Sequence, residues 1–234
     1  MTAGRLGILG GTFDPIHLGH VAAAMAASRA LALDRVMLVP SCLPPHRAML
    51  SRTSPEHRLA MAALAAGAHP HWSASDVEVV REGPSYTFDT LSGLIRDGQA
   101  RSQIFFIIGA DAFADIAMWS RYPAVLDLAH FAVVARPGIT LDSLTARVPD
   151  LADRMTTPDQ LRPSVAGLQP PLQELEGPTA ATRVILIEAA TPEVSSTDIR
   201  RRVGVGESIL GLVPDGVADY ISQHRLYEYD SNGT

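Results

Sequence analysis

Short apolar runs alternate with longer alanine-rich or amphipathic segments along most of the sequence. Apolar runs of this kind are typical of strands buried on both faces of a sheet, and the longer segments have the composition of helices. Strands that alternate with helices predict βαβ units, a mainly parallel sheet and right-handed crossovers. The predicted strands are residues 6–9, 36–39, 76–80, 104–108, 131–135 and 184–187, and the predicted helices are 20–33, 55–66 with Ser54 as its cap, 87–96 with Ser85 as its cap, a segment containing Phe113 and Ile116, 141–148, 196–202 and 213–224.

The length and composition suit one folded domain. With 234 residues, of which 47% are hydrophobic and 19% charged, the chain is long enough for an α/β core and unlike a disordered chain. We therefore expect a single Rossmann-like domain over residues 1–234, with helices on both faces of the sheet. Residues 139–182 contain several prolines and glutamines, which predicts an irregular elaboration within that domain.

The overall charge limits the classes of partner. The formal net charge is -6 at pH 7, whereas general binders of nucleic acid or of anionic membranes need a broad basic surface. No apolar run approaches the roughly 20 residues that span a bilayer, and the first residues lack the pattern of a secretory signal. The single cysteine, Cys42, excludes an intramolecular disulfide and a cysteine-rich metal cluster. We expect a soluble cytoplasmic protein in which any anion site is local.

The most informative stretch is residues 6–20, where the first predicted strand leads to the first predicted helix. Gly10 and Gly11 lie at the end of the strand, and glycine lets a ligand come close to the backbone. Free amides at the start of a helix attract anions and bind phosphate well. His17 and His20 are three residues apart, so on one helical turn they point the same way. The stretch predicts an anion site that two imidazoles face.

A second polar stretch follows the last predicted strand. Ser196 and Thr197 stand at a helix start, and Arg200 comes one turn later. By itself such a string is a helix-capping motif. Hydroxyls, free amides and a guanidinium also suit a polyphosphate, because arginine forms forked, charge-assisted hydrogen bonds to phosphate oxygens. Since ligands of open parallel sheets bind beyond the carboxyl ends of the strands, both stretches are predicted at the ligand-binding edge.

Two other interpretations of the first stretch have weaker support. A dinucleotide-binding dehydrogenase also begins with a glycine loop, but Gly7, Gly10 and Gly11 do not match G-x-G-x-x-G, and no acid ends the second predicted strand. The two histidines are spaced to share a metal ion, yet Asp14 is the one further ligand near them and the H-E-x-x-H pattern is absent. We therefore assign no metal-ligating residues.

Together the two stretches resemble the signatures of a known superfamily. Residues 10–20 resemble the H-x-G-H signature of the nucleotidyltransferases, and residues 195–200 resemble their distal S-S-T-x-x-R signature. The pair is far more specific than either signature alone. Further matches narrow the resemblance to nicotinate-nucleotide adenylyltransferases and extend over nearly the whole chain, at residues 44–47, 84–91, 109–111, 119, 136–138 and 213–227.

The resemblance implies transfer of AMP from ATP to nicotinate mononucleotide, which gives nicotinate adenine dinucleotide (deamido-NAD) and pyrophosphate in NAD biosynthesis, with Mg²⁺ accompanying ATP. It implies direct in-line attack without a covalent enzyme intermediate, because the attacking group is already a phosphate on the acceptor. It also implies three sets of site residues. The catalytic set is His17, His20 and Arg200; the ATP-binding set is Gly10, Gly11, Thr12, Phe13, Gly109, Asp111, Ser196 and Thr197; the set for nicotinate mononucleotide is His46, Arg47, Tyr86, Thr87, Trp119 and Arg136.

The resemblance leaves the acceptor and the assembly open. The phosphate-handling signatures are shared across the superfamily, so nicotinamide mononucleotide and phosphopantetheine are alternative acceptors, and a nucleotide-binding module without catalysis is an alternative of another class. Taken without the resemblance, Tyr86 and Trp119 are more often core or rim aromatics than ligands. Arg47 stands where the family often has lysine, which keeps the charge and changes its geometry. Residues 139–182 are longer than expected of a compact member, and two roles are open for them: contacts in a homo-oligomer, or a part of the surface alone.

Overall fold

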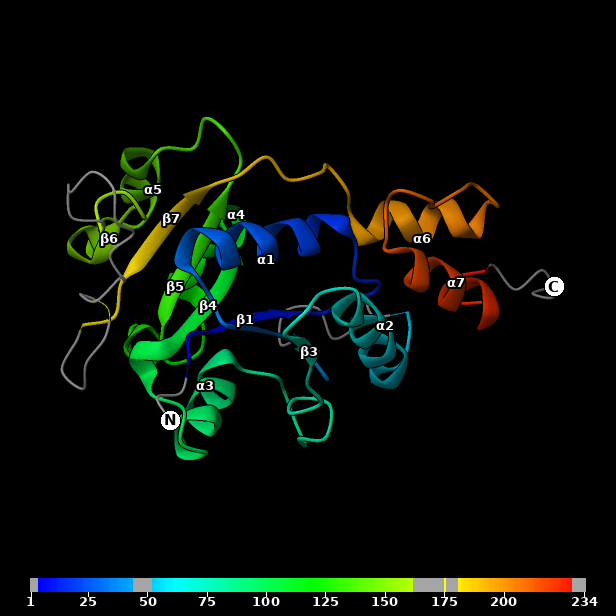
Figure 1. The fold of residues 1–234 in the computed structure, drawn as a ribbon, viewed down its shortest axis with the longest axis horizontal. Coiled ribbons are helices and arrows are strands. Elements are labelled where there is room, and N and C mark those ends of the chain that lie inside the picture. Colours follow the sequence, from blue (N-terminus) through cyan, green and yellow to red (C-terminus); the bar gives the residue numbers. More distant parts are fainter. Residues whose placement is uncertain (1–3, 44–51, 162–174, 176–180, 229–234) are drawn as a thin grey trace. The chain divides into compact units, whose positions relative to one another are not determined.

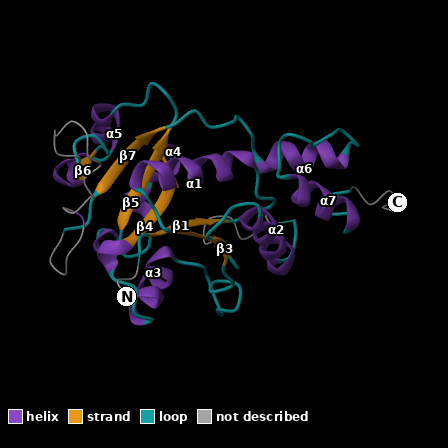
Figure 2. Cartoon of the chain, viewed as in Figure 1, coloured by secondary structure: helices purple, strands orange, loops and turns teal. Residues whose placement is uncertain are grey.

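The computed structural model describes residues 4–43, 52–161, 175 and 181–228. Strands and helices alternate along these residues (Figure 2), which confirms the predicted α/β class. The strands form one sheet in the order β3-β2-β1-β4-β5-β7-β6. The strands are β1 (Leu6–Gly11), β2 (Arg35–Pro40), β3 (Trp72–Ala74), β4 (Ile104–Gly109), β5 (His130–Ala135), β6 (Met155–Thr156) and β7 (Val184–Glu188), and the α-helices are α1 (Leu18–Leu31), α2 (Pro55–Gly67), α3 (Thr87–Arg96), α4 (Ala110–Phe113), α5 (Leu141–Arg147), α6 (Ser196–Gly204) and α7 (Asp215–Gln223).

Two compact units divide the chain. The first comprises Met1–Gly10, Ala23–Val36 and Tyr86–Thr191, and the second comprises Gly11–Ala22, Met37–Ser85 and Pro192–Thr234. Each unit is therefore assembled from three separate stretches of sequence, which local sequence patterns do not reveal. The expectation of a single domain over residues 1–234 stays a prediction.

The first unit is built on parallel strands whose faces are covered. β4 pairs in parallel with β1 and with β5, and β7 pairs in parallel with β5 and with β6. Every residue of β5 is buried, so side chains on both faces of the sheet are covered there, as a continuous apolar run predicts. β4, β5 and β7 lie side by side in Figure 1. Phe105, Phe113 and Phe131 are fully buried in this core.

The second unit packs α2 against α7 and β3. As predicted, Ser54 caps α2: its hydroxyl accepts a hydrogen bond from the backbone N–H of His57, and Pro55 occupies the first helical position. Across the helix pair, the Nδ1 atom of His57 lies 2.9 Å from the hydroxyl oxygen of Tyr220 in α7. Over the ranges that the structure covers, none of the helices combines the length and the apolar character needed to cross a membrane.

The prediction of a strand at residues 76–80 is wrong. The short strand in this region is β3, and the residues after it form a turn in which the backbone N–H of Val80 donates to the carbonyl of Asp76 at 2.9 Å. The Ser75 hydroxyl accepts from the backbone N–H of Val77 at 3.3 Å, a local bond that competes with sheet pairing. Val80 is 72% exposed, so its apolar side chain is not part of a core.

Three further elements differ from the predictions. Ser85 does not cap α3: Tyr86 occupies the cap position, and the Ser85 hydroxyl accepts from the backbone N–H of Cys42 at 2.9 Å. The helix predicted around Phe113 is broken, because α4 ends there and a separate 3-10 turn, Ile116–Met118, follows it. The described part of residues 139–182 contains α5, a 3-10 turn at Pro149–Arg154 and the edge strand β6, so this part is more regular than predicted.

Candidate functional site

The end of the loop after β1 and the first turn of α1 bring His17 and His20 together within the second unit. Their imidazole rings are stacked, with centroids 3.7 Å apart and 25° between the ring planes. The backbone N–H of His17 donates to Nδ1 of His20 at 3.2 Å, and the backbone N–H of His20 donates to the carbonyl oxygen of His17 at 2.9 Å. The predicted juxtaposition of the two imidazoles at the start of the helix is confirmed.

Two glycines leave room for the rings of the histidine loop (residues 12–20): Gly11 directly before it and Gly19 within it. A Cβ atom added at Gly19 would lie 3.0 Å from Nδ1 of His17 and 3.4 Å from the carbonyl oxygen of Pro192. One added at Gly11 would lie 2.8 Å from the ring of Phe13. Contacts this short force neighbouring atoms to move in a close-packed interior. The glycine of the H-x-G-H pattern is therefore the residue that makes room for the first histidine ring.

Phe13 supports the histidine pair by packing. Its ring meets the ring of His20 edge-on, with centroids 5.1 Å apart. The side chain of Phe13 is buried and its φ is 51°, in the left-handed region that bulky residues rarely adopt. Such a conformation persists where the surrounding structure enforces it. Any contact of Phe13 with ATP would therefore come from its backbone, since the ring is enclosed.

Burial keeps both imidazoles neutral at pH 7. It lowers the pKa of His17 from 6.5 to about 4. For His20, burial and, secondarily, the neighbouring His17 lower the pKa well below 6.5. A neutral imidazole still carries one N–H donor. In the free protein the pair therefore offers hydrogen bonds, not two fixed positive charges.

The lowered pKa of His17 predicts a loss of stability in mild acid. Because this pKa is about 4 in the folded protein against 6.5 for the ordinary group, the unfolded chain binds the proton first as the pH falls. The free energy of unfolding should decrease from about pH 6.5 to about pH 4 and lose nothing more from this group below that, a contribution of about 3 kcal/mol. His17→Asn should flatten the slope, measured by urea unfolding at a series of pH values.

The slope of unfolding free energy against pH is compared between the wild-type and His17→Asn proteins. Carboxylates gain most of their protons below about pH 5, so above that pH they contribute little to the slope. The informative window is therefore between about pH 5 and pH 6.5, where the slope of the wild-type protein should exceed that of the variant. Identical slopes in this window would contradict the buried, neutral state of His17.

The start of α6 is joined to the histidine loop by hydrogen bonds. The Ser196 hydroxyl donates to the carbonyl oxygen of Pro15 at 2.9 Å. Arg200 donates from Nη1 to the carbonyl oxygen of Asp14 at 2.6 Å and from Nη2 to the Thr197 hydroxyl at 3.2 Å. Two motifs far apart in the sequence thus meet in one place, as a shared site for a polyphosphate requires.

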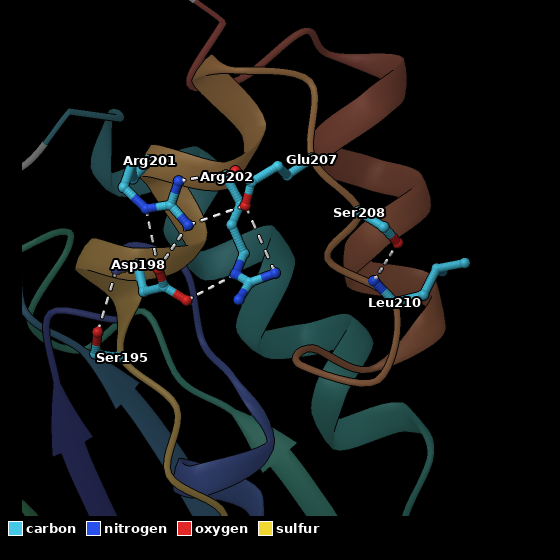
Figure 3. A network of polar contacts seen from close by, with 7 residues as sticks. All are labelled: Ser195, Asp198, Arg201, Arg202, Glu207, Ser208 and Leu210. Atoms are coloured by element: carbon cyan, nitrogen blue, oxygen red, sulfur yellow. Dashed lines mark hydrogen bonds and ion pairs between the residues drawn. The ribbon is translucent and has the colours of Figure 1, made fainter.

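Three consecutive arginines of α6 differ in their partners, and Figure 3 shows two of them, Arg201 and Arg202. Arg201 and Arg202 pair with Asp198 at 3.0 and 2.7 Å, and both also pair with Glu207, at 2.9 and 3.7 Å. Arg200 forms no ion pair with any residue that the structure describes, and its hydrogen bonds go to neutral oxygens. α6 therefore presents one guanidinium whose charge no described carboxylate balances, which suits an anionic ligand.

Arg58 in α2 is a structural residue that the sequence analysis missed. Its side chain is 1% exposed. Nη1 donates to the carbonyl of Thr12 at 2.8 Å and to that of Ser41, and Nη2 donates to the carbonyl of Cys42 at 3.0 Å. The guanidinium thus ties the histidine loop to the loop after β2. One feature of the sequence indicates this burial: Arg58 lies one helical turn before Ala62, on the buried face of the helix.

Asp14 is a second residue whose role local sequence patterns do not reveal, since its spacing from the histidines suggests only a metal ligand. Its carboxylate accepts hydrogen bonds from the backbone N–H of Arg52 at 2.7 Å, the Thr53 hydroxyl at 2.6 Å and the Tyr227 hydroxyl at 2.8 Å. A metal ion would have to displace these donors. Within the described ranges, no group of three or more His, Cys, Asp or Glu is arranged to hold a metal ion.

Gly109 and Arg136 lie in the first unit, at the carboxyl ends of neighbouring strands. Gly109 ends β4, opposite Val134 of β5, and Arg136 follows β5. This is the edge at which open parallel sheets bind ligands. The φ of Gly109 is -72°, and a Cβ atom added there would meet no atom within 4 Å. Neither the backbone nor the packing of the described residues requires a glycine at this position.

The other predicted residues of the first unit surround the same strands or begin α3. Trp119 is half-buried and meets Phe106 edge-on, with ring centroids 5.8 Å apart. Asp111 in α4 is exposed, and its nearest cation is Arg147 at 4.0 Å. Tyr86 is the cap residue of α3 and is followed by Thr87. His46 and Arg47 lie outside the described residues, and the roles of all these residues stay predictions.

Comparison with known proteins places the chain in a family. Residues 8–202 match the model of the cytidylyltransferase-like family. A probable nicotinate-nucleotide adenylyltransferase of Roseiflexus sp. (strain RS-1) is 41% identical, over 97% of this chain and 100% of its own. One of Leifsonia xyli subsp. xyli (strain CTCB07) is 39% identical, over 95% of this chain and 94% of its own.

A solved structure extends the likeness to the fold. The Plasmodium falciparum nicotinic acid mononucleotide adenylyltransferase complexed with NaAD has a TM-score of 0.65 and 16% identity, covering 96% of this chain and 98% of that chain. At this identity the likeness concerns the fold alone, and it agrees with the parallel sheet described above. The family match and the identities over nearly the whole length together show that the chain belongs to the cytidylyltransferase-like family and, within it, to the nicotinate-nucleotide adenylyltransferases.

Proposed function

We propose that the protein transfers AMP from ATP to nicotinate mononucleotide, forming nicotinate adenine dinucleotide and releasing pyrophosphate in NAD biosynthesis. The names of the curated relatives support this activity. The observation that carries the proposal is the meeting of the stacked His17 and His20 with Arg200 around one loop. Two imidazole donors and an unbalanced guanidinium suit a triphosphate.

The reaction needs no nucleophile from the protein. A phosphate oxygen of the acceptor attacks the α-phosphorus of ATP, and the bond from that phosphorus to the oxygen bridging the β-phosphate breaks. Pyrophosphate leaves with the bonding electron pair. Well-aligned reactants reach effective molarities of about 10⁵ to 10⁸ M, and one preorganised donor contributes about 10² to 10³ in rate. Alignment and a few donors therefore suffice.

The histidine loop and the start of α6 would each bind some of the phosphates of ATP. His17 and His20 would donate to phosphate oxygens. The negative charge of the bound triphosphate would favour their protonated forms, whereas burial favours the neutral forms. Arg200 and Thr197 would bind the distal phosphates. Because the Ser196 hydroxyl already donates to a backbone carbonyl, Ser196 would contribute its backbone N–H at the start of α6.

The contacts to the nucleoside and to the acceptor rest on the resemblance. Open space at Gly109 supports a close approach of adenosine, with Asp111 beside it. Backbone amides of the histidine loop would also bind ATP. We assign the remaining positions to the acceptor: Tyr86, Thr87 and Trp119 around the nicotinate ring, and Arg136, His46 and Arg47 as its cationic partners.

We expect Mg²⁺ to reach the site on ATP. This ion binds readily to substrate phosphates and keeps several waters, so it needs few protein ligands. The carboxylate of Asp14, in the histidine loop, already accepts hydrogen bonds from three protein donors and so is not expected to bind Mg²⁺. Mg²⁺ on the phosphates would neutralise charge as pyrophosphate leaves.

The decisive experiment offers ATP and Mg²⁺ with one acceptor at a time and follows pyrophosphate. Nicotinate mononucleotide should turn over faster than nicotinamide mononucleotide, and phosphopantetheine should not react. Faster turnover of nicotinamide mononucleotide or of phosphopantetheine would contradict the assignment of nicotinate mononucleotide as the acceptor, but not the transfer of AMP from ATP. ATP binding without pyrophosphate release from any acceptor would instead favour a nucleotide-binding module without catalysis.

Two properties of the assembled protein belong to the same proposal. We propose that it acts in the cytoplasm, which agrees with a single cysteine in the chain. A homo-oligomer is the expected assembly if residues 139–182 supply contacts between copies. Size-exclusion chromatography with light scattering, with and without deletion of this segment, tests that expectation.

A further inference from the structure

Asp14 is the meeting point of several chain segments in the second unit. Its side chain is 2% exposed. Its Oδ1 accepts from the Thr53 hydroxyl at 2.6 Å and from the Tyr227 hydroxyl at 2.8 Å, and its Oδ2 accepts from the backbone N–H of Arg52 at 2.7 Å. Its carbonyl oxygen accepts from Arg200 at 2.6 Å. The start of α2, the residues after α7 and α6 therefore all converge on this one residue.

Tyr227 is the most distant of these partners in the sequence, and its conformation is imposed by the fold. Its φ is 66°, in the left-handed region that bulky residues rarely adopt. The preceding residue, Leu226, is buried, and its backbone N–H donates to the carbonyl of Ile221 at 3.0 Å. Burial, with Asp14 beside it, raises the pKa of Tyr227, so its hydroxyl keeps the proton that it donates.

The backbone around Asp14 carries groups of the proposed site. The carbonyl oxygens of Asp14 and Pro15 receive Arg200 and Ser196, and His17 follows two residues later. A shift of the Asp14 side chain would therefore move the acceptors that orient α6 together with the first histidine. A misplacement of about 1 Å in a site can cost about 10² in rate.

We propose that Tyr227 is a positioning residue: through the Asp14 carboxylate, its hydroxyl fixes the histidine loop in the geometry that binds the phosphates of ATP. This inference rests on the proposed function. Tyr227 itself has no direct role at the reacting atoms. Its effect passes through Asp14 to the loop and to Arg200.

The test removes the hydroxyl alone. Tyr227→Phe keeps the ring, and we expect the Kd for ATP to rise and kcat/KM to fall by about tenfold each. Tyr220→Phe is the matched control, because its hydroxyl is also hydrogen-bonded, to His57, but lies outside the Asp14 cluster. The control should stay within about twofold of wild type in both measurements.

A second pair of variants tests the same carboxylate from its other side. Thr53→Val removes the hydroxyl that donates to Oδ1 and should act like Tyr227→Phe, whereas Thr53→Ser keeps a hydroxyl and should retain most of the affinity. Because this pair is independent of the residues after α7, it keeps the test decisive if Tyr227→Phe folds poorly.

Affinity separates positioning from a merely structural role. Partial unfolding lowers the active fraction and the apparent kcat, but it leaves the Kd for ATP of the folded molecules unchanged. Equal Kd values for Tyr227→Phe and Tyr220→Phe, or for Thr53→Val and Thr53→Ser, would overturn the inference. Absence of turnover by the wild-type protein with nicotinate mononucleotide would instead overturn the proposed function, and the ATP affinities would still decide the role of Tyr227.

Discussion

His20→Ala is expected to lower kcat with ATP, Mg²⁺ and nicotinate mononucleotide by at least about a hundredfold. The imidazole of His20 is held by the backbone N–H of His17 and stacked on its ring. It is thus a preorganised donor, and the loss of one such donor costs about 10² to 10³ in rate. The fold should be retained, because alanine is a better helix former than histidine at this position in α1. Pyrophosphate release measures the rate, and circular dichroism checks the fold.

His224→Ala provides the control for this substitution. His224 lies just after α7 in the same unit and is exposed. Its replacement removes an imidazole of the same size away from the histidine loop, so we expect activity within about twofold of wild type. His20→Gln adds a graded comparison, because its amide retains a donor. Near-complete activity of His20→Ala would remove His20 from the mechanism.

Arg58→Met is expected to produce the largest loss of stability, about 3 kcal/mol. The substitution keeps much of the side-chain volume but removes the donors for the carbonyls of Thr12, Ser41 and Cys42. The buried carbonyl oxygens would then have no hydrogen-bond donor from water or from the protein, which lowers the free energy of unfolding. For a chain of this length the melting temperature should fall by about 6 to 12 °C.

Arg29→Met is the matched control for the loss at Arg58. Arg29 is an exposed residue of α1, and its replacement should change stability by less than about 0.5 kcal/mol. Urea unfolding and thermal scans of both variants give the comparison. An Arg58→Met protein as stable as Arg29→Met would show that the buried guanidinium does not hold the two loops together.

The order of strands and helices was predictable because burial on both faces demands an uninterrupted apolar run. Residues 104–108 and 131–135 satisfy this demand and are strands in the structure, in β4 and β5. Residues 76–80 contain the apolar Val77 and Val80 but turn back on themselves, because a local hydrogen bond from the backbone to the Ser75 hydroxyl competes with sheet pairing.

The residue types of the candidate site and the pairing of its two histidines were predictable, whereas the buried residues that support the site were not. His17, His20 and Arg200 were singled out because imidazole and guanidinium donors at helix starts suit phosphate. That Arg58 is a buried anchor was not predictable, since an arginine in a helix is ordinarily solvated. The same limit applies to Asp14, whose partners come from three other segments of the second unit.

The α/β class, the phosphate-binding motifs and the family follow from the amino-acid sequence, because they depend on local periodicity and on residue types at fixed spacing. Three features follow instead from the folded chain: the neutral state of His17 and His20, the guanidinium of Arg200 without an ion pair among the described residues, and the bond from Tyr227 to Asp14. Charge states depend on burial, and burial is a property of the assembled unit. The bond between Tyr227 and Asp14 joins residues 213 positions apart, a pairing that local sequence patterns do not encode.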